Sequence, residues 1–202
     1  MCPKVTAQHK IEVKNKIIES ALTTFSKYGY DRTRMDDIAD AADVSKGTLY
    51  LYFKSKEELF YAISERNVSR LKEQLSKLMA TRKEELVPNA EKFYENFHKE
   101  RGEDFEKVYF EIIAESSRNP KLKKMLYEQR LKIIDVVAEY LNLQVEREIF
   151  AKDVDIKSIS SGLVSLFNGL SISRISGMSE SSNKQAWKET IRALFKGISY
   201  LS

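Results

Sequence analysis

Residues Thr33 to Lys56 read T-R-M-D-D-I-A-D-A-A-D-V-S-K-G-T-L-Y-L-Y-F-K-S-K. Three side-chain patterns that cap helix N-termini fall within them: Thr33 with Asp36, Ser45, and Ser55 with Glu58. They predict a short helix ending near Ala42, a turn at Asp43 and Val44, a second helix over Lys46–Phe53, and the start of a long helix. Two short helices joined by a turn of about 3–4 residues form a helix-turn-helix, whose second helix enters the DNA major groove.

The composition of the predicted second helix suits contact with DNA. Leu49 and Phe53 are four residues apart, so they share one face of the helix and are expected to be buried. The rest of this region offers cations, hydroxyl groups and a glycine that permits close backbone approach. We expect contacts with bases or phosphates near the helix start from Ser45, Lys46, Gly47, Thr48 and Tyr50, and phosphate contacts from Thr33, Arg34, Tyr52, Lys54 and Lys56. The alternative interpretation is a helical corner that binds another protein.

The run from Gly29 to Leu59, G-Y-D-R-T-R-M-D-D-I-A-D-A-A-D-V-S-K-G-T-L-Y-L-Y-F-K-S-K-E-E-L, resembles the DNA-binding domain of TetR family transcriptional repressors. The matching positions are Gly29, Thr33, Ile38, Ala39, Val44, Ser45, Gly47, Leu49, Tyr50, Tyr52, Phe53, Lys56 and Leu59. The family usually has glycine in the turn where this chain has Asp43, and aspartate tolerates left-handed backbone better than most residues. The resemblance implies a homodimer that binds a palindromic double-stranded DNA operator under the control of a small-molecule effector. It does not decide between a repressor and an activator.

The composition predicts an all-α fold of about nine helices. Among the 202 residues there are only seven glycines and three prolines. We expect a three-helix DNA-binding domain over residues 1–57, with the helix-turn-helix at 33–53, and a larger regulatory and dimerisation domain over residues 58–202. The net charge of +4 is mild, and residues 1–60 hold ten Lys and Arg against nine Asp and Glu. The prediction of DNA binding therefore depends on where the cations lie, and not on their excess.

Several classes of site are not indicated. Cys2 is the only cysteine, which leaves no intramolecular disulfide or cysteine-based metal site, and His9 and His98 fit no zinc spacing. No phosphate-binding glycine motif and no nucleophile elbow occurs. We expect no catalytic residues, no metal and no cofactor, and an enzyme with a site in the larger domain is the alternative. Without a long apolar segment, we expect a cytoplasmic protein with no membrane association.

Helix signals continue on both sides of this region. Ile17, Ala21 and Phe25 form an apolar stripe on a helix over Ile11–Tyr28 that should stop at Gly29. Further helices are predicted over Lys56–Arg82, Pro88–Lys99, Asp104–Ser117 and Pro120–Leu143, with Asn119 as an N-cap. Before them, Lys4, His9 and Lys10 belong either to a frayed terminus or to an arm that reaches DNA phosphate.

Aromatic residues are concentrated in the middle of the chain. They indicate either a packed core or a ligand cavity between helices. Because the family resemblance implies effector binding in this region, we predict a cavity lined by Phe97, Phe105, Tyr109, Phe110, Ile113, Tyr127, Arg130, Ile134 and Phe167. Arg130 falls among apolar neighbours and is either the partner of an anionic head group or a surface arginine.

In each of the last two predicted helices, apolar residues recur in alternating steps of three and four, which is the spacing of a seam between packed helices in a bundle. The seam residues predicted at a dimer interface are Ile159, Leu163, Leu166, Leu170, Trp187, Ile191, Leu194 and Ile198. A second row of small residues follows Gly162, Ser165, Gly169, Ser173 and Ser176, and the sequence does not decide which row faces a partner. The alternative is a helix pair buried within one subunit. We expect a loop over Gly177–Asn183.

Overall fold

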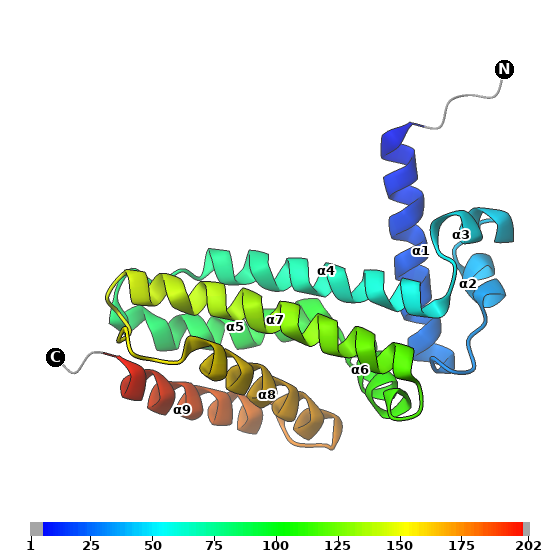
Figure 1. Ribbon diagram of the computed structural model, residues 1–202. Helices are drawn as coiled ribbons and strands as arrows, with labels where there is room; N and C mark the ends of the chain where they lie inside the picture. The colour runs from blue at the N-terminus through cyan, green and yellow to red at the C-terminus, as the bar shows by residue number, and fades with distance from the viewer. Residues whose placement is uncertain (1–5, 200–202) are drawn as a thin grey trace. The chain divides into compact units, whose positions relative to one another are not determined.

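The computed structural model of the chain describes residues 6–199 (Figure 1). Every regular element in this range is helical, which confirms the all-α prediction. The helices are α1 (Ala7–Tyr28), α2 (Met35–Ala41), α3 (Lys46–Tyr52), α4 (Lys56–Lys77), the short 3-10 helix η1 (Lys83–Glu85), α5 (Leu86–Arg101), α6 (Glu103–Ser116), α7 (Pro120–Glu146), α8 (Ile156–Ile175) and α9 (Glu180–Ile198). No helix of residues 6–199 is long and apolar enough to cross a membrane.

The chain divides into two compact units. Unit 1 consists of Met1–Asn67 and Gly102–Tyr127, and unit 2 of Val68–Arg101 and Glu128–Ser202. Helices α4 and α7 therefore contribute their first turns to unit 1 and their remainder to unit 2. The DNA-binding domain expected over residues 1–57 lies inside unit 1, which is larger because α6 packs on α1.

The helix-turn-helix in unit 1 has the form that the capping signals predict. Ser45 caps α3, since its Oγ accepts the N–H of Thr48 at 3.1 Å. The turn is closed by the N–H of Val44, which donates to the Ala39 carbonyl at 3.1 Å. Asp43 has φ +49°, so this aspartate takes the left-handed backbone that the family usually gives to glycine.

The core of unit 1 joins the helix-turn-helix to α1, α4 and α6 (Figure 1). The predicted stripe of α1 is confirmed, because Ile17, Ala21 and Phe25 are fully buried. Gly29 ends the helix with φ +88°, and its N–H donates to the Phe25 carbonyl at 2.9 Å. Phe60 of α4 stacks on Phe105 of α6 with ring centroids 6.3 Å apart. The apolar faces of all these elements meet in one cluster, which fixes α2 and α3 on α1.

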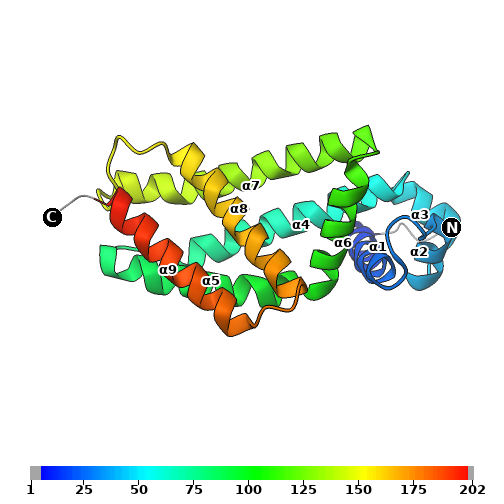
Figure 2. The same ribbon diagram turned by 90° about the horizontal axis from the view of Figure 1, so that it is seen from below.

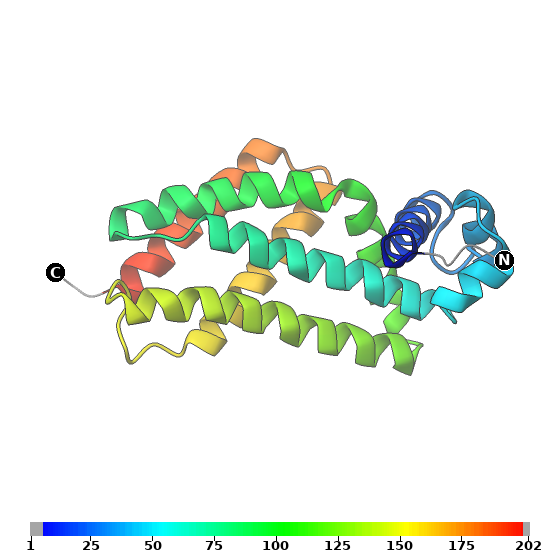
Figure 3. The same ribbon diagram turned by 90° about the horizontal axis from the view of Figure 1, so that it is seen from above.

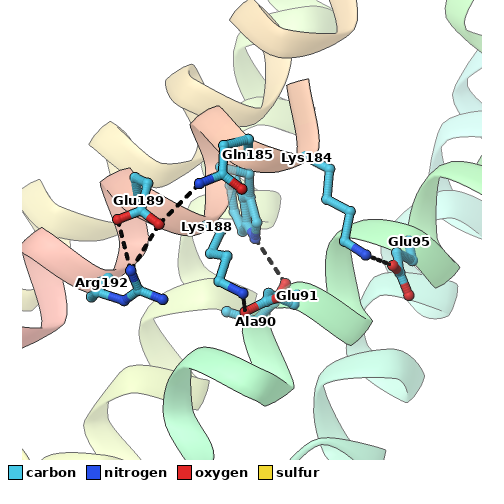
Figure 4. A network of polar contacts seen from close by, with 9 residues as sticks. Ala90, Glu91, Glu95, Lys184, Gln185, Lys188, Glu189 and Arg192 are labelled. Carbon is cyan, nitrogen blue, oxygen red and sulfur yellow. Dashed lines mark hydrogen bonds and ion pairs between the residues drawn. The ribbon is translucent and has the colours of Figure 1, made fainter. Parts of the chain in front are cut away.

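In unit 2, α5 lies beside α9, and α8 packs on α9 (Figure 2). Figure 3 shows the unit 2 parts of α4 and α7 side by side, where Lys72 and Glu139 form an ion pair at 3.1 Å. Figure 4 shows the contact between α5 and α9. The indole N–H of Trp187 donates to the Ala90 carbonyl at 2.7 Å, and Lys188 pairs with Glu91 at 2.9 Å.

Several helix boundaries differ from the predicted ones, most of all the start of α1 and the end of α4. α1 begins at Ala7 because Thr6 caps it by accepting the N–H of His9 at 3.2 Å. His9 and Lys10 are therefore helical, and the frayed terminus is wrong for them, whereas Lys4 lies outside the described residues. The long helix predicted to Arg82 stops at Lys77, and a new turn begins where Glu85 accepts the N–H of Thr81 at 2.8 Å.

The loop before α9 is shorter than predicted. Ser179 caps the helix by accepting the N–H of Ser182 at 3.1 Å. Asn183, expected in the loop, is a buried helical residue whose amide donates to the Leu170 carbonyl at 3.3 Å. The N-cap predicted at Asn119 is confirmed, because its side chain accepts the N–H of Lys121 at 3.0 Å.

Candidate nucleic-acid interface

Helix α3 has one buried face and one exposed face. Leu49 is fully buried and Phe53 nearly so, as their spacing predicts. The predicted contact residues Ser45, Lys46, Gly47 and Tyr50 are exposed, and Thr48 and Tyr52 are half-buried. The Ser45 and Thr48 hydroxyl oxygens lie 2.8 Å apart, so the two side chains are held together at the start of the helix. The structure thus places these six predicted residues together on or beside one accessible surface.

Leu51 is a candidate that the sequence-based prediction missed. It lies on α3 and is 75% exposed, the highest value among the large apolar residues found exposed in the described chain. An apolar side chain on a helix that also carries a cation and hydroxyl groups is suited to contact the methyl group of thymine in the major groove. The signal was present in the sequence, since a residue two positions after the buried Leu49 points to the other side of a helix.

Thr33 does not have the predicted role. The residue that caps α2 is Arg34, and Thr33 is only 2% exposed. Its hydroxyl donates to the Gly29 carbonyl at 2.7 Å, so it ties the end of α1 to the chain that enters α2. A phosphate contact from this hydroxyl is therefore a wrong prediction. Arg34 is exposed, and its backbone N–H donates to Asp37 at 2.7 Å.

The two lysines after α3 differ from each other. Lys54 is exposed, and its ammonium donates to the Tyr50 carbonyl. Lys56 instead donates to the Tyr30 carbonyl at 2.7 Å and to the Asp31 carbonyl at 2.9 Å, and it lies over the Tyr30 ring. The phosphate role of Lys56 stays a prediction, and the structure adds that its ammonium holds the turn between α1 and α2 in place.

The same turn is held from a second side by α6. The Glu111 carboxylate accepts the N–H of Tyr30 at 2.8 Å, and Ser26 donates to Asp104 at 2.6 Å. Burial raises the pKa of the Tyr30 phenol above its usual value, so this ring acts as part of the core. A Cβ on Gly29 would lie 3.1 Å from the Glu111 carboxylate and would also be strained at positive φ. The backbone entering α2 is thus constrained by α1, α4 and α6 together.

An ion pair connects the first turns of α2 and α3. The Lys46 ammonium donates to Asp36 Oδ2 at 2.7 Å. This hydrogen bond lowers the pKa of Asp36 and raises the pKa of Lys46. Both groups are charged at neutral pH, so the cation at the start of α3 is partly neutralised by a carboxylate of the same molecule.

The predicted effector-binding residues are divided between the two units. Phe105, Tyr109, Phe110, Ile113 and Tyr127 belong to unit 1, and Phe97, Arg130, Ile134 and Phe167 belong to unit 2. Phe105 is part of the unit 1 core, whereas Ile113 and Tyr127 are exposed.

Within unit 2, Phe97 and Phe167 are in contact, with ring centroids 5.5 Å apart. Phe167 is also stacked on His98 at 4.6 Å and lies 5.9 Å from the Trp187 ring. Arg130 donates to the Ser165 hydroxyl at 2.8 Å, which ties α7 to α8. The cavity lining therefore stays a prediction, and its aromatic part within unit 2 is centred on Phe167.

The predicted dimer seam faces its own subunit at four positions. Leu163, Leu170, Trp187 and Ile191 are buried within the unit 2 core, while Ile159, Leu166, Leu194 and Ile198 are half-buried against it. The seam prediction is wrong for the four buried residues, because the core of their own unit already buries them. The small-residue row of α8 is exposed at Gly162, Ser165, Gly169 and Ser176. A matching exposed row on α9, which the sequence-based prediction missed, consists of Ala186, Thr190, Ala193 and Gly197.

Residues 6–199 contain no group of three or more His, Cys, Asp or Glu side chains able to hold a metal ion.

Comparison with known proteins places the arrangement of the helix-turn-helix in a family. Residues 17–63 match the family model described as bacterial regulatory proteins, tetR family. The structure resembles that of Salmonella enterica GusR, with a TM-score of 0.74 and 25% sequence identity over 96% of this chain and 97% of that one.

The helix-turn-helix domain of this chain belongs to the TetR family. Among its relatives, YhgD of Bacillus subtilis (strain 168), named an uncharacterized HTH-type transcriptional regulator, is 30% identical over 141 residues. These cover 70% of this chain and 65% of YhgD. IcaR of Staphylococcus aureus (strain Newman), named a biofilm operon negative transcriptional regulator, is 46% identical over 48 residues, which are 24% of this chain and 26% of IcaR. The matches thus cover less than two thirds of either relative, and the TetR family model matches the part of unit 1 that contains the helix-turn-helix.

Proposed function

We propose that the protein is a ligand-responsive transcriptional repressor that binds a palindromic DNA operator as a homodimer and is released by a small effector. The observation that carries the proposal is the exposed face of α3, which presents the Lys46 cation, hydroxyl groups and an apolar side chain on a helix fixed by a buried core. Two copies of α3 on a two-fold axis would enter successive major grooves, about 34 Å apart. The name of IcaR, a negative regulator, supports repression.

Within this proposal the residues of α3 divide by chemistry. We assign base-edge contacts to Lys46, Thr48 and Tyr50, and a thymine-methyl contact to the exposed Leu51. We assign phosphate contacts to the exposed Arg34 and Lys54, and such contacts orient the protein on DNA but carry no sequence information. Ser45 caps the start of α3, and the half-buried Tyr52 packs against the unit 1 core.

The first prediction tests the DNA interface through Leu51. Because this side chain is 75% exposed, Leu51→Ala should change the free energy of unfolding by less than about 0.5 kcal/mol. Loss of one buried methyl contact, at about 0.8 kcal/mol, should weaken operator binding roughly fourfold. An operator can be selected from a random-sequence duplex library, and affinity measured by fluorescence anisotropy.

A chemical control separates the methyl contact from other effects. An operator in which deoxyuridine replaces thymidine at every position should bind the wild-type protein more weakly, and the Leu51→Ala variant should bind the two operators with a smaller difference. Equal binding of both operators by the wild-type protein would remove Leu51 from the base contacts. Failure of the wild-type protein to select any duplex would contradict DNA binding itself.

For the dimer, we propose the exposed small-residue rows of α8 and α9. Small side chains permit close approach of two helix backbones, and Ile172, Ile175 and Met178 add exposed apolar surface nearby. Association of these helices with their copies would form a four-helix bundle on a two-fold axis. The buried seam residues would then support the interface from inside each subunit.

The second prediction tests this face. A Cβ on Gly169 meets no atom within 4 Å, so Gly169→Glu should fold normally as a monomer. The added carboxylate would be buried against its symmetry copy, and the dimer should dissociate at micromolar concentration. Lys157→Glu, on α8 but outside the row, is the control and should remain dimeric. Sedimentation velocity distinguishes the two states, and a dimeric Gly169→Glu protein would place the interface elsewhere.

For the effector, we propose a small apolar or amphipathic molecule, such as a drug, a lipid or a fatty acyl thioester, held in unit 2 near Phe97, Ile134 and Phe167. The support is the concentration of aromatic rings around Phe167, with Arg130 as a partner for an anionic group. An effector that binds better to a conformation with wrongly spaced α3 helices lowers operator affinity by that difference. Native mass spectrometry of the purified protein tests for such a molecule.

A further inference from the structure

The polypeptide around the helix-turn-helix carries more acid than base. Between residues 31 and 58 there are seven Asp and Glu residues and five Lys and Arg residues. Binding to DNA of any sequence derives mainly from cations that neutralise phosphates. The excess of acidic residues around the helix-turn-helix therefore weakens binding to DNA of any sequence. The positions of the individual carboxylates indicate which cation they affect.

One carboxylate lies directly on the cation nearest the start of α3. Asp36, in the first turn of α2, accepts a hydrogen bond from the Lys46 ammonium at 2.7 Å. The Lys46 side chain is 64% exposed and that of Asp36 is 33% exposed, so the pair lies on the accessible surface beside α3. Asp37 by contrast accepts a backbone N–H in its own helix, and Asp43 lies 3.6 Å from Lys16 of α1.

We propose that Asp36 is a specificity-determining residue, which holds the Lys46 ammonium so that it contributes little to binding of random DNA and is directed to a base edge in the operator. The inference rests on the proposed function. An ammonium has three N–H donors, and the hydrogen bond to Asp36 uses one. The others remain for the O6 and N7 acceptors of a guanine, while the adjacent carboxylate repels phosphate oxygens. Lys46 thus discriminates between sequences and does not simply anchor the protein.

The test compares two variants with the same change of charge on the same helix. Asp36→Asn removes the partner of Lys46. Asp40→Asn is the matched control, because Asp40 is exposed on α2 and does not accept the Lys46 hydrogen bond. Asp36→Asn should raise affinity for a random duplex about two- to fivefold at low salt and steepen the salt dependence by about 0.9 in log–log slope, as for one added phosphate contact. Asp40→Asn should raise the affinity for a random duplex less, and the slope of its salt dependence should stay as in the wild type.

The ratio of operator affinity to random-duplex affinity is the deciding quantity. It should fall in Asp36→Asn and stay unchanged in Asp40→Asn, with thermal unfolding of both variants measured to confirm folding. In a Lys46→Ala background, Asp36→Asn should have no more effect than Asp40→Asn. Equal effects of the two substitutions in the wild-type background, or an unchanged ratio in Asp36→Asn, would overturn the inference. A wild-type protein with no preference for any duplex would instead overturn the proposed function.

Discussion

Trp187→Ala should lower the free energy of unfolding by about 3–5 kcal/mol, the range seen when a large aromatic side chain is removed from a core. Trp187 is 4% exposed and lies 5.5 Å from the Tyr94 ring, stacked upon it. Its indole N–H also satisfies the Ala90 carbonyl, so the truncation leaves both a cavity and a carbonyl without that donor. The residue joins α9 to α5, and its loss should loosen that contact.

The free energy of unfolding is measured by urea titration followed by circular dichroism, because Trp187 is the only tryptophan and the variant lacks tryptophan fluorescence. The protein concentration is kept fixed, because the stability of an associating protein depends on it. Trp187→Phe should cost less, because it keeps a ring and loses only part of the volume and the N–H donor. Lys184→Met is the matched control on the same helix. It removes an exposed ion pair with Glu95 of α5 and should change stability by at most about 1 kcal/mol. If Trp187→Ala resembled this control, the contact between α5 and α9 would not depend on Trp187.

Lys56→Ala should destabilise unit 1 by about 1–3 kcal/mol, because two backbone carbonyls lose a charged donor. The Tyr30 carbonyl at 2.7 Å and the Asp31 carbonyl at 2.9 Å both belong to the turn that leads into α2. Operator binding should weaken only as far as the folded fraction falls, and the slope of affinity against salt concentration should stay as in the wild type. A lysine that contacted phosphate would lower that slope by about 0.9.

Two further variants sharpen this prediction. Lys56→Met keeps the aliphatic stem and loses the donors, so it separates packing from hydrogen bonding. Lys54→Ala is the nearby comparison, because Lys54 is exposed and should lower the salt slope with little loss of stability. Thermal unfolding and salt-titrated anisotropy together decide the result. Wild-type stability of Lys56→Ala combined with a lower slope would support the phosphate role of Lys56.

Local features of unit 1 could be predicted from the sequence because their partners are close along the chain. The cap at Ser45 bonds to a residue three positions away, and the helix end at Gly29 to one four positions away. The burial of Leu49 beside the exposed face of α3 follows from helix geometry alone. The same geometry places Leu51 on the exposed face, although the predicted DNA contacts did not include it.

Contacts between residues far apart in the sequence could not be predicted. Lys56 bonds to carbonyls 25 and 26 residues away, which no local pattern indicates. The predicted effector residues looked alike, yet they separate into two compact units. Their aromatic character indicates burial but does not specify which rings are buried together.

The sequence by itself determined that this chain is helical and that residues 33–53 form a helix-turn-helix, because capping and periodicity act over a few residues. Only the tertiary structure decided what each apolar face is buried against. The seam of α8 and α9 shows this most clearly, since Leu163 and Ile191 have the spacing of an interface but are covered by their own subunit. Periodicity shows that a face is buried, whereas the identity of the covering surface depends on how the whole chain packs.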